Sequence, residues 1–226
     1  MLRLENLLVQ QDDFRLMADV RFPDAALTAV VGPSGAGKST VLSVIAGFYA
    51  ATRGDVLWQD RPVTGIAPAK RPCAILFQDN NLFPHLTAAQ NVALGLGKGT
   101  RPTAAVFDAL ADVGLQGFEN RKPAQLSGGQ QSRVALARVM LQDKPVVLLD
   151  EPFSALGPAR RTEMIALVRD RLVAKGRTVI MVTHDRSDAN AADFVSVVAD
   201  GRVAQPVETS ALLAAPPEEL RAYWGK

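Results

Sequence analysis

The sequence contains a single cysteine, few aromatic residues and no long hydrophobic run, and each shortage excludes a class of protein. Cys73 is the only cysteine, so no disulfide bond can form within the chain, which fits a reducing compartment. Aromatic residues make up 6 % of the chain, too few for a stacking platform that binds single-stranded nucleic acid. No apolar stretch approaches the roughly 18 residues that a membrane-spanning helix needs. We therefore expect any membrane role to come through a partner.

The charge of the chain is equally modest. Its 25 basic and 23 acidic residues give a net charge of +2, which does not argue for nucleic-acid binding by itself. The first residues, MLRLENLL, lack the charged and apolar regions of a signal peptide. Hydrophobic residues, in contrast, form 48 % of the 226 residues, which is enough for a well-buried core. This length predicts one core, with room for a lobe inserted into it.

Short apolar runs rich in β-branched residues predict a parallel sheet that is flanked by helices. The runs with the length and composition of buried strands are LTAVVG (27–32), CAILF (73–77), PVVLLD (145–150) and TVIMVTH (178–184). Helices are expected at 38–46, 159–175 and 187–192. Two earlier strands, at 2–10 and 14–22, are joined by a polar turn and predict an antiparallel β subdomain. Residues 194–208 predict a hairpin around Asp200-Gly201, followed by a short tail.

Residues 82–141 differ from the rest of the chain, because helix signals replace strand signals there. Thr87 with Gln90, and Ser127 with Gln130, have the spacing of a capping box. We therefore predict an α/β fold with one domain over residues 1–226. Its parts are a core (1–81 and 142–226) and a helical lobe (82–141) inserted between two parallel strands.

The stretch GPSGAGKS matches the pattern G-x-x-x-x-G-K-[ST] between a predicted strand and a predicted helix, which is the context of a phosphate-binding loop. Its glycines let backbone N–H groups point inward, and the helix N-terminus also favours an anion. Lys38 is placed to reach the β- and γ-phosphate oxygens, and Ser39 offers a hydroxyl group to Mg²⁺. The residues expected to bind ATP are Gly32, Pro33, Ser34, Gly35, Ala36, Gly37, Lys38, Ser39 and Thr40. The alternative is an ordinary strand–turn–helix loop, and the flanking elements argue against it.

In VVLLDE, two acidic residues lie at the C-terminal end of a predicted buried strand, at the edge of a parallel sheet where ligands bind. Asp150 suits a Mg²⁺ ion, because hard cations prefer oxygen ligands. Glu151 is placed to polarise a water molecule for in-line attack on the γ-phosphate. A solvated strand end that carries two acids is the alternative, and the phosphate-binding loop makes it the weaker one.

Two further polar residues are expected at the same edge. Gln78 follows the strand CAILF, where its amide can contact both metal and water, although without a family pattern an ordinary loop glutamine is the favoured interpretation. His184 ends the strand TVIMVTH and can donate a hydrogen bond to the γ-phosphate, with a strand-capping histidine as the alternative. We interpret His85 as structural or interfacial, and Cys73 as a small core residue.

These motifs together resemble the ATP-binding cassette ATPases, in the family's order and over nearly the whole chain. GPSGAGKST is similar to the Walker A loop of that family, LSGGQ to its signature motif, and VVLLDE to its Walker B motif. Gln78 resembles the Q-loop glutamine and His184 the switch histidine. The resemblance implies an ATPase that uses ATP and Mg²⁺, with Glu151, His184 and Gln78 as catalytic residues. It also implies Ser39, Gln78 and Asp150 as Mg²⁺ ligands.

The resemblance also gives a role to the second glycine-rich loop. Cassettes of this family pack head to tail in pairs, so that the signature motif of one covers the ATP held by the other. The residues expected to contact the ATP of a partner cassette are Ser127, Gly128, Gly129 and Gln130. The simplest partner is a second copy related by two-fold symmetry, which ATP closes and hydrolysis reopens.

Residues 71–96 and the run LSGGQQSRVALARVM are similar, more narrowly, to the ATPase subunits of bacterial thiamine importers. This implies a peripheral translocase subunit at the cytoplasmic face of the inner membrane. Its partners would be permease subunits and, indirectly, a periplasmic substrate-binding protein, without nucleic acid. The segment NNLFPHL (80–86) is expected to help dock a helix of the membrane subunit. Import of ferric iron, sulfate or polyamines stays an alternative, and a soluble non-transport ATPase is a weaker one.

The sequence departs from the family pattern at two places. Gly157 stands where the family has an aspartate, which favours the hypothesis that the two ATP sites are coupled less tightly here. The aromatic residue that stacks on adenine is not evident, because Gln11 and Asp12 occupy its usual region. Phe14 is the nearest candidate, and burial in the core is its alternative.

Overall fold

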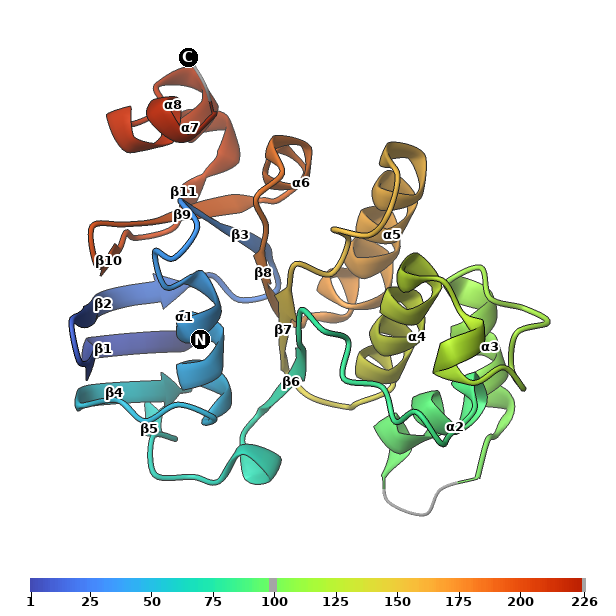
Figure 1. The fold of residues 1–226 in the computed structure, drawn as a ribbon. Helices are drawn as coiled ribbons and strands as arrows, with labels where there is room; N and C mark the ends of the chain where they lie inside the picture. The colour runs from blue at the N-terminus through green and yellow to red at the C-terminus, as the bar shows by residue number, and fades with distance from the viewer. Residues whose placement is uncertain (98–100, 225–226) are drawn as a thin grey trace.

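The computed structural model describes residues 1–97 and 101–224, and its strands form one strongly curved sheet around a helix (Figure 1). The order across the sheet is β5-β4-β1-β2-β10-β9-β3-β8-β7-β6, and β11 pairs with β9 outside this path. The strands are β1 (Leu2–Gln11), β2 (Phe14–Phe22), β3 (Leu27–Val31), β4 (Arg53–Trp58), β5 (Arg61–Pro62), β6 (Cys73–Leu76), β7 (Val146–Asp150), β8 (Thr178–Val182), β9 (Phe194–Ala199), β10 (Arg202–Val203) and β11 (Val207–Glu208).

The parallel part of the sheet consists of β6, β7, β8, β3 and β9, and each strand pairs in parallel with the next. Every residue of β3, β7 and β8 is buried, as expected for strands covered on both faces. This explains why these segments read as continuous apolar runs. Because the strands are parallel, their carboxyl ends meet at one edge, where the chain leaves β3, β6, β7 and β8 into loops.

The antiparallel part consists of β2, β1, β4 and β5, in which consecutive neighbours run in opposite directions. The short strand β10 joins the two parts, because it pairs in parallel with β2 and antiparallel with β9. Asp200 and Gly201 both have positive φ angles, 48° and 69°, as a tight hairpin turn requires.

The helices are distributed over both faces of the parallel strands (Figure 1). The α-helices are α1 (Lys38–Ala46), α2 (Ala88–Ala93), α3 (Ala104–Asp112), α4 (Gly128–Met140), α5 (Pro158–Arg171), α6 (Arg186–Asn190), α7 (Thr209–Ala214) and α8 (Glu218–Trp224). Short 3₁₀ helices are η1 (Pro68–Lys70), η2 (Leu94–Leu96), η3 (Pro123–Gln125) and η4 (Val173–Lys175).

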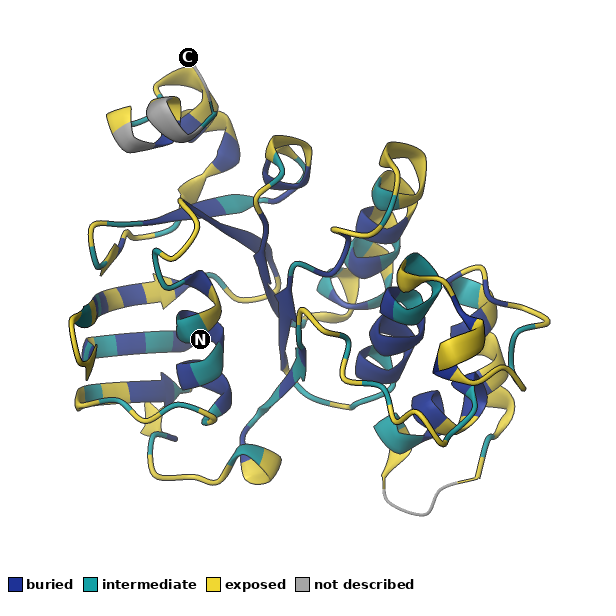
Figure 2. Ribbon diagram, viewed as in Figure 1, coloured by how far each residue is buried: buried dark blue, intermediate teal, exposed yellow. Residues whose placement is uncertain are grey.

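Two hydrophobic clusters lie on opposite faces of the parallel strands, because successive side chains of a strand point to opposite faces. Figure 2 shows that these strands are buried along most of their length. One cluster joins α1 and the antiparallel strands to one face, for example through Leu42 and Val30. The other joins the remaining helices to the opposite face, where Ala29 and Val31 of the same strand point. Helix α1 is thus enclosed between the two parts of the sheet, which fixes the loop that precedes it.

The predicted α/β fold with an antiparallel β subdomain is confirmed. Between β6 and β7 the described residues contain helices and loops, although residues 98–100 of the expected lobe lie outside the described residues. Among the described helices, none is both long and apolar enough to cross a membrane.

Three sequence expectations were wrong or incomplete. Strand β8 ends at Val182, so His184 lies in the loop after it and does not end the strand. The stretch after the hairpin was predicted to be a short tail and instead contains α7 and α8. Strands β4 and β5 were not expected, because Gly54 and Asp55 interrupt the apolar pattern of β4.

Candidate functional site

The loop between β3 and α1 is built so that only glycine fits at two of its positions. A Cβ atom at Gly32 would lie 2.0 Å from the carbonyl oxygen of Val198, so the loop approaches β9 too closely for a side chain. Gly37, the residue before α1, has a φ angle of 101°, and a Cβ atom there would lie 2.9 Å from Phe14 Cζ. The backbone therefore wraps tightly around the N-terminus of α1.

Lys38 is buried at the start of α1 and folds back onto this loop. Its Nζ donates hydrogen bonds of 2.8 Å to the carbonyl oxygens of Gly32 and Pro33. Burial lowers the pKa of the ammonium group, and the negative charges of Glu151 and Asp150 oppose that shift. The ammonium group thus lies inside the loop, where it faces the two carboxylates that follow β7.

Ser39 and Asp150 bring together two elements that are far apart in the sequence. The Ser39 hydroxyl donates a 3.0 Å hydrogen bond to Asp150 Oδ1, which links α1 to the end of β7. Burial raises the pKa of the Asp150 carboxyl, while the bond from Ser39 and the charge of Lys38 act in the opposite direction. A hydroxyl and a carboxylate oxygen held side by side form a donor set suited to a hard divalent cation.

Glu151 directly follows β7 and faces His184. His184 Nδ1 lies 3.2 Å from Glu151 Oε2, because β7 and β8 are neighbours and their loops leave the sheet at the same edge. Glu151 has a φ angle of 46°, an unfavourable conformation for a residue with a side chain. Its side chain is 20 % exposed and that of His184 54 %, so the pair lies at the mouth of the site.

One cavity of about 320 Å³ brings together residues of the loop before α1 with Gln78 and Glu151. The residues that line it are Phe14, Ser34, Gly35, Gly37, Lys38, Ser39, Thr40, Gln78 and Glu151. Gln78 reaches it from the loop after β6, although it lies two residues beyond the strand end. A second hollow of about 390 Å³ shares Phe14 and Thr40 and adds Tyr49, Gln11, Asp12 and Asp13. Phe14 therefore lies between both hollows, is half-buried, and also packs against the hydrophobic cluster that contains α1.

The family model described as "ABC transporter" matches residues 17–154, which include the loop before α1 and the carboxylates after β7. The chain belongs to the ABC transporter family. It is therefore an ATP-binding ATPase, as the sequence predicted. This membership also explains why a phosphate-binding loop and an acidic pair occur on one sheet edge.

Curated relatives of this ABC protein match all or most of its length. The thiamine import ATP-binding protein ThiQ of Cereibacter sphaeroides is 50 % identical over 100 % of both chains. The protein of the same name from Vibrio cholerae is 45 % identical and covers 90 % of this chain and 87 % of its own length.

Solved structures of cassettes share the fold. A dimeric post-hydrolysis structure of the ATP-binding cassette MJ0796 bound to ADP and Pi has a TM-score of 0.81 and 28 % identity, covering 92 % of this chain and 99 % of its own. The ADP conformation of the cassette MJ1267 has a TM-score of 0.84 and 25 % identity, covering 100 % and 99 %.

The signature residues of this ABC protein do not line the cavity. Ser127, Gly128, Gly129 and Gln130 form the N-terminus of α4, which lies on the other side of β6 and β7 from α1 (Figure 1). Gln130 N donates to Ser127 Oγ at 3.3 Å, and Ser127 N donates to Gln130 Oε1 at 2.8 Å. The structure thus brings the Walker residues, Gln78 and His184 together, and leaves the signature residues apart from them.

Tyr49 is the one aromatic neighbour of this site that sequence reasoning missed. It follows the C-terminus of α1, and its hydroxyl donates a hydrogen bond to Gln11. No motif marks it, because its place beside Phe14 depends on how α1 packs against the antiparallel strands. His85, interpreted as structural or interfacial, is exposed and lies edge-on to Phe83.

Proposed function

We propose that this chain couples ATP hydrolysis to the import of thiamine, as the peripheral ATPase subunit of a bacterial transporter. The observation that carries the ATP chemistry is the single cavity that Lys38, Ser39, Gln78 and Glu151 line together, with Asp150 bonded to Ser39. The observation that favours thiamine is the end-to-end identity of 50 % to a thiamine import ATP-binding protein.

In this proposal, the loop from Gly32 to Thr40 binds the phosphates of ATP. Lys38 exchanges its two carbonyl partners for phosphate oxygens, which offer its charge a better partner than neutral carbonyl groups do. Ser39, Asp150 and Gln78 present a hydroxyl, a carboxylate and an amide oxygen, and this set fits Mg²⁺. When bound, Mg²⁺ supplies charge neutralisation for the phosphates.

Glu151 is the proposed base that polarises the attacking water, and His184 is its neighbour. An imidazole that bonds Glu151 through Nδ1 and donates to the γ-phosphate through Nε2 must carry a proton on both nitrogens. The 3.2 Å contact therefore supports a role for His184 in sensing the γ-phosphate while it remains in contact with Glu151.

A complete site requires a second copy of the chain. The N-terminus of α4 offers a serine hydroxyl, two glycines and free N–H groups, all suited to a phosphate, yet it lies away from the chain's own cavity. We propose that Ser127, Gly128, Gly129 and Gln130 contact the ATP of a symmetry-related copy. The dimeric form of the related cassette MJ0796 supports this arrangement.

The membrane partners are also part of the proposal. The chain would bind permease subunits at the cytoplasmic face of the inner membrane, and a periplasmic binding protein would deliver the substrate to them. Phe83 is 47 % exposed in the segment 80–86, which supports that segment as part of the docking surface.

Uptake of labelled thiamine tests the proposal in cells that lack the native chain. Cells that receive the wild-type chain should regain uptake, and cells that receive Glu151→Gln at equal expression should not, because the variant retains ATP without hydrolysing it. Equal thiamine uptake by cells with the wild-type chain and cells with Glu151→Gln would contradict the role of Glu151.

Failure of both variants, with ATP hydrolysis intact in the purified wild type, would contradict thiamine alone. Uptake of ferric iron, sulfate and polyamines would then be measured with the same two variants. If none of these substrates were imported, we would reject the role in import in favour of a soluble, non-transport ATPase.

A further inference from the structure

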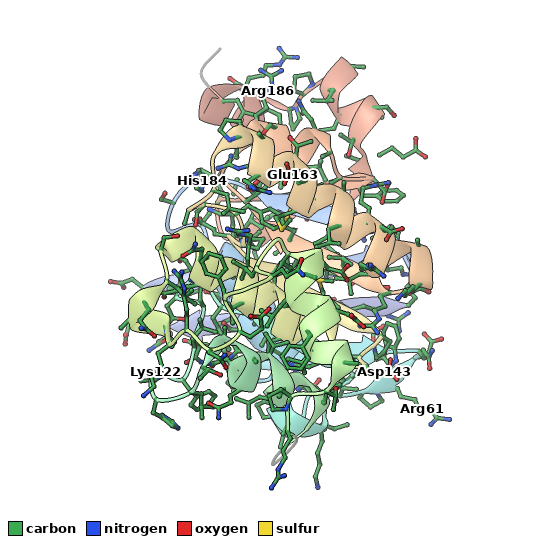
Figure 3. All side chains as sticks on the ribbon, turned by 90° about the vertical axis from the view of Figure 1, so that its right-hand side faces the viewer. Arg61, Lys122, Asp143, Glu163, His184 and Arg186 are labelled. Carbon is green, nitrogen blue, oxygen red and sulfur yellow. The ribbon has the colours of Figure 1, made fainter. Side chains whose placement is uncertain are left out.

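One arginine of α5 ties the loop of His184 to the rest of the site. Arg161 lies in the first turn of α5, and only 13 % of its side chain is exposed. Its Nη1 forms an ion pair with Asp185, the residue after His184. Glu163 lies two residues after Arg161 on α5, and Figure 3 shows Glu163 and His184 in the same upper part of the molecule. The side chain of Arg161 therefore bridges from α5 to the loop that follows β8.

The same guanidinium group holds the loop that follows Glu151. Arg161 Nη2 donates to the carbonyl oxygens of Phe153 at 3.4 Å and of Leu156 at 3.5 Å. These two acceptors and Asp185 belong to the segments that leave β7 and β8. Because Glu151 begins the first segment and His184 lies in the second, Arg161 fixes one segment relative to the other.

The loop held by Arg161 also supports the signature residues of the same chain. A Cβ atom at Gly129 would lie 2.8 Å from Leu156 Cδ2 and 3.0 Å from the carbonyl oxygen of Ala155. The N-terminus of α4 therefore packs directly on this loop. A displacement of the loop would move the signature residues and the Glu151–His184 pair together.

Asp188 holds the other side of the His184 loop. Its side chain is 4 % exposed, and its Oδ2 accepts a 2.8 Å hydrogen bond from the hydroxyl of Thr183, the residue before His184. The same hydroxyl accepts a 3.1 Å hydrogen bond from Asp185 N. The backbone is thus held on both sides of His184 by Asp185 and Asp188, and both carboxylates face Arg161.

One contact between Arg161 and Asp188 is too long for a hydrogen bond. Arg161 Nε and Asp188 Oδ1 are buried 3.6 Å apart, and neither has a hydrogen-bond partner among the described residues. This separation exceeds a normal N–H···O hydrogen bond of about 2.9 Å, and buried polar atoms without partners are unfavourable. A small shift of either loop toward the other would complete the pair.

We infer that Arg161 is a positioning residue, which sets His184 against Glu151. The inference rests on the proposed role of His184 in hydrolysis. Lysine cannot replace this arginine, because one ammonium group cannot bond two carbonyl groups and two carboxylates that surround a planar fork. The residue touches neither the cavity that binds ATP nor any predicted phosphate contact, so it acts through His184.

Arg161→Lys tests the inference, with Arg171→Lys as a matched control. Arg171 lies on the same helix, forms a 2.6 Å ion pair with Asp112, and also has a buried Nε without a hydrogen-bond partner among the described residues. ATP hydrolysis by the purified full-length chain gives kcat and KM. We expect Arg161→Lys to lower kcat about tenfold or more with KM for ATP changed less than about twofold, because misplaced catalytic groups slow turnover without weakening ground-state binding. The control should retain its kcat.

A double-mutant cycle with His184→Ala separates positioning from a purely structural role. If Arg161 acts through His184, Arg161→Lys should have no further effect on the residual kcat of His184→Ala. If the fold-losses in kcat of the two single variants multiplied in the double variant, the inference would be overturned. A normal kcat in Arg161→Lys would also overturn it. A normal kcat in His184→Ala alone would instead contradict the proposed role of His184.

Thermal melting of every variant shows whether it is folded at the assay temperature. If Arg161→Lys is not folded at that temperature, Asp188→Asn takes its place in the same double-mutant cycle. That variant keeps the shape of the side chain and an acceptor for Thr183, and replaces the carboxylate oxygen that faces Arg161 with an uncharged NH2 group. The expected and the contradicting outcomes are the same for both variants.

Discussion

Gly128→Ala separates the stability of the chain from the proposed function of its signature residues. Gly128 is exposed in the first turn of α4, and the nearest described atom to an added Cβ is Ala155 Cβ at 3.8 Å, an ordinary contact. The methyl group therefore fits the chain and should stabilise it by about 0.4–1 kcal/mol, because alanine restricts the unfolded chain more than glycine does. For a protein of this size, that corresponds to a melting temperature roughly 1–4 °C higher.

The same substitution should nevertheless lower the rate of ATP hydrolysis at least about tenfold, a loss of about 1.4 kcal/mol of transition-state stabilisation. The added methyl group occupies space that the proposed phosphate of the second copy needs. Gly65→Ala is the matched control, because Gly65 is also exposed, has no described atom within 4 Å of an added Cβ, and lies outside the cavity. Its rate should stay at the wild-type level.

Mixing two inactive variants shows whether the signature acts on the partner's ATP. Lys38→Ala damages the site that its own chain builds, and Gly128→Ala damages the site of the other chain. In an equal mixture, about a quarter of the wild-type rate should return, because half of the dimers are mixed and each mixed dimer has one intact site. No recovery would refute action across the dimer, provided that mixtures of Lys38→Ala with wild type show that a single intact site turns over.

Two further predictions concern the departures from the family pattern. Gly157→Asp should fold normally, because Gly157 precedes α5 with an extended φ angle of −71° and has no described atom within 4 Å of an added Cβ. If its aspartate restores coupling between the sites, the Hill coefficient for ATP should rise; an unchanged rate and Hill coefficient would contradict the hypothesis. Phe14→Ala should raise KM for ATP about tenfold, as loss of one base–aromatic stack predicts, with little change in kcat. A KM equal to that of the wild type would show that Phe14 does not contact adenine.

The conformation of the loop between β3 and α1 could be predicted from sequence because its geometry is local. Gly32, Gly37 and Lys38 act within one turn between a strand and a helix, so their spacing alone encodes the conformation. Gly47 ends α1 for the same kind of reason, since its φ angle of 84° completes a left-handed cap.

Contacts between distant segments could not be predicted in this way. The pairing of His184 with Glu151 depends on β8 lying beside β7, and strand order is absent from any local pattern. Arg161 was overlooked for the same reason, because nothing in its neighbourhood distinguishes it from the other arginines of α5. Strand β4 was missed because it is held by β1, through pairs such as Leu4 with Val56, and not by its own weak alternation.

The site concentrates features that disfavour folding, and this follows from its task. Glu151 adopts a strained backbone conformation, Asp150 is a buried carboxyl whose pKa is raised, and Lys38 is a buried ammonium group with neutral partners. The two hydrophobic clusters on either side of the parallel strands offset these costs without taking part in the chemistry. ATP and Mg²⁺ would give Lys38 and Asp150 charged partners, so binding should stabilise the chain at these two residues. A nucleotide-dependent rise in melting temperature that is lost in Lys38→Ala would therefore measure the same interactions that prepare the site for hydrolysis.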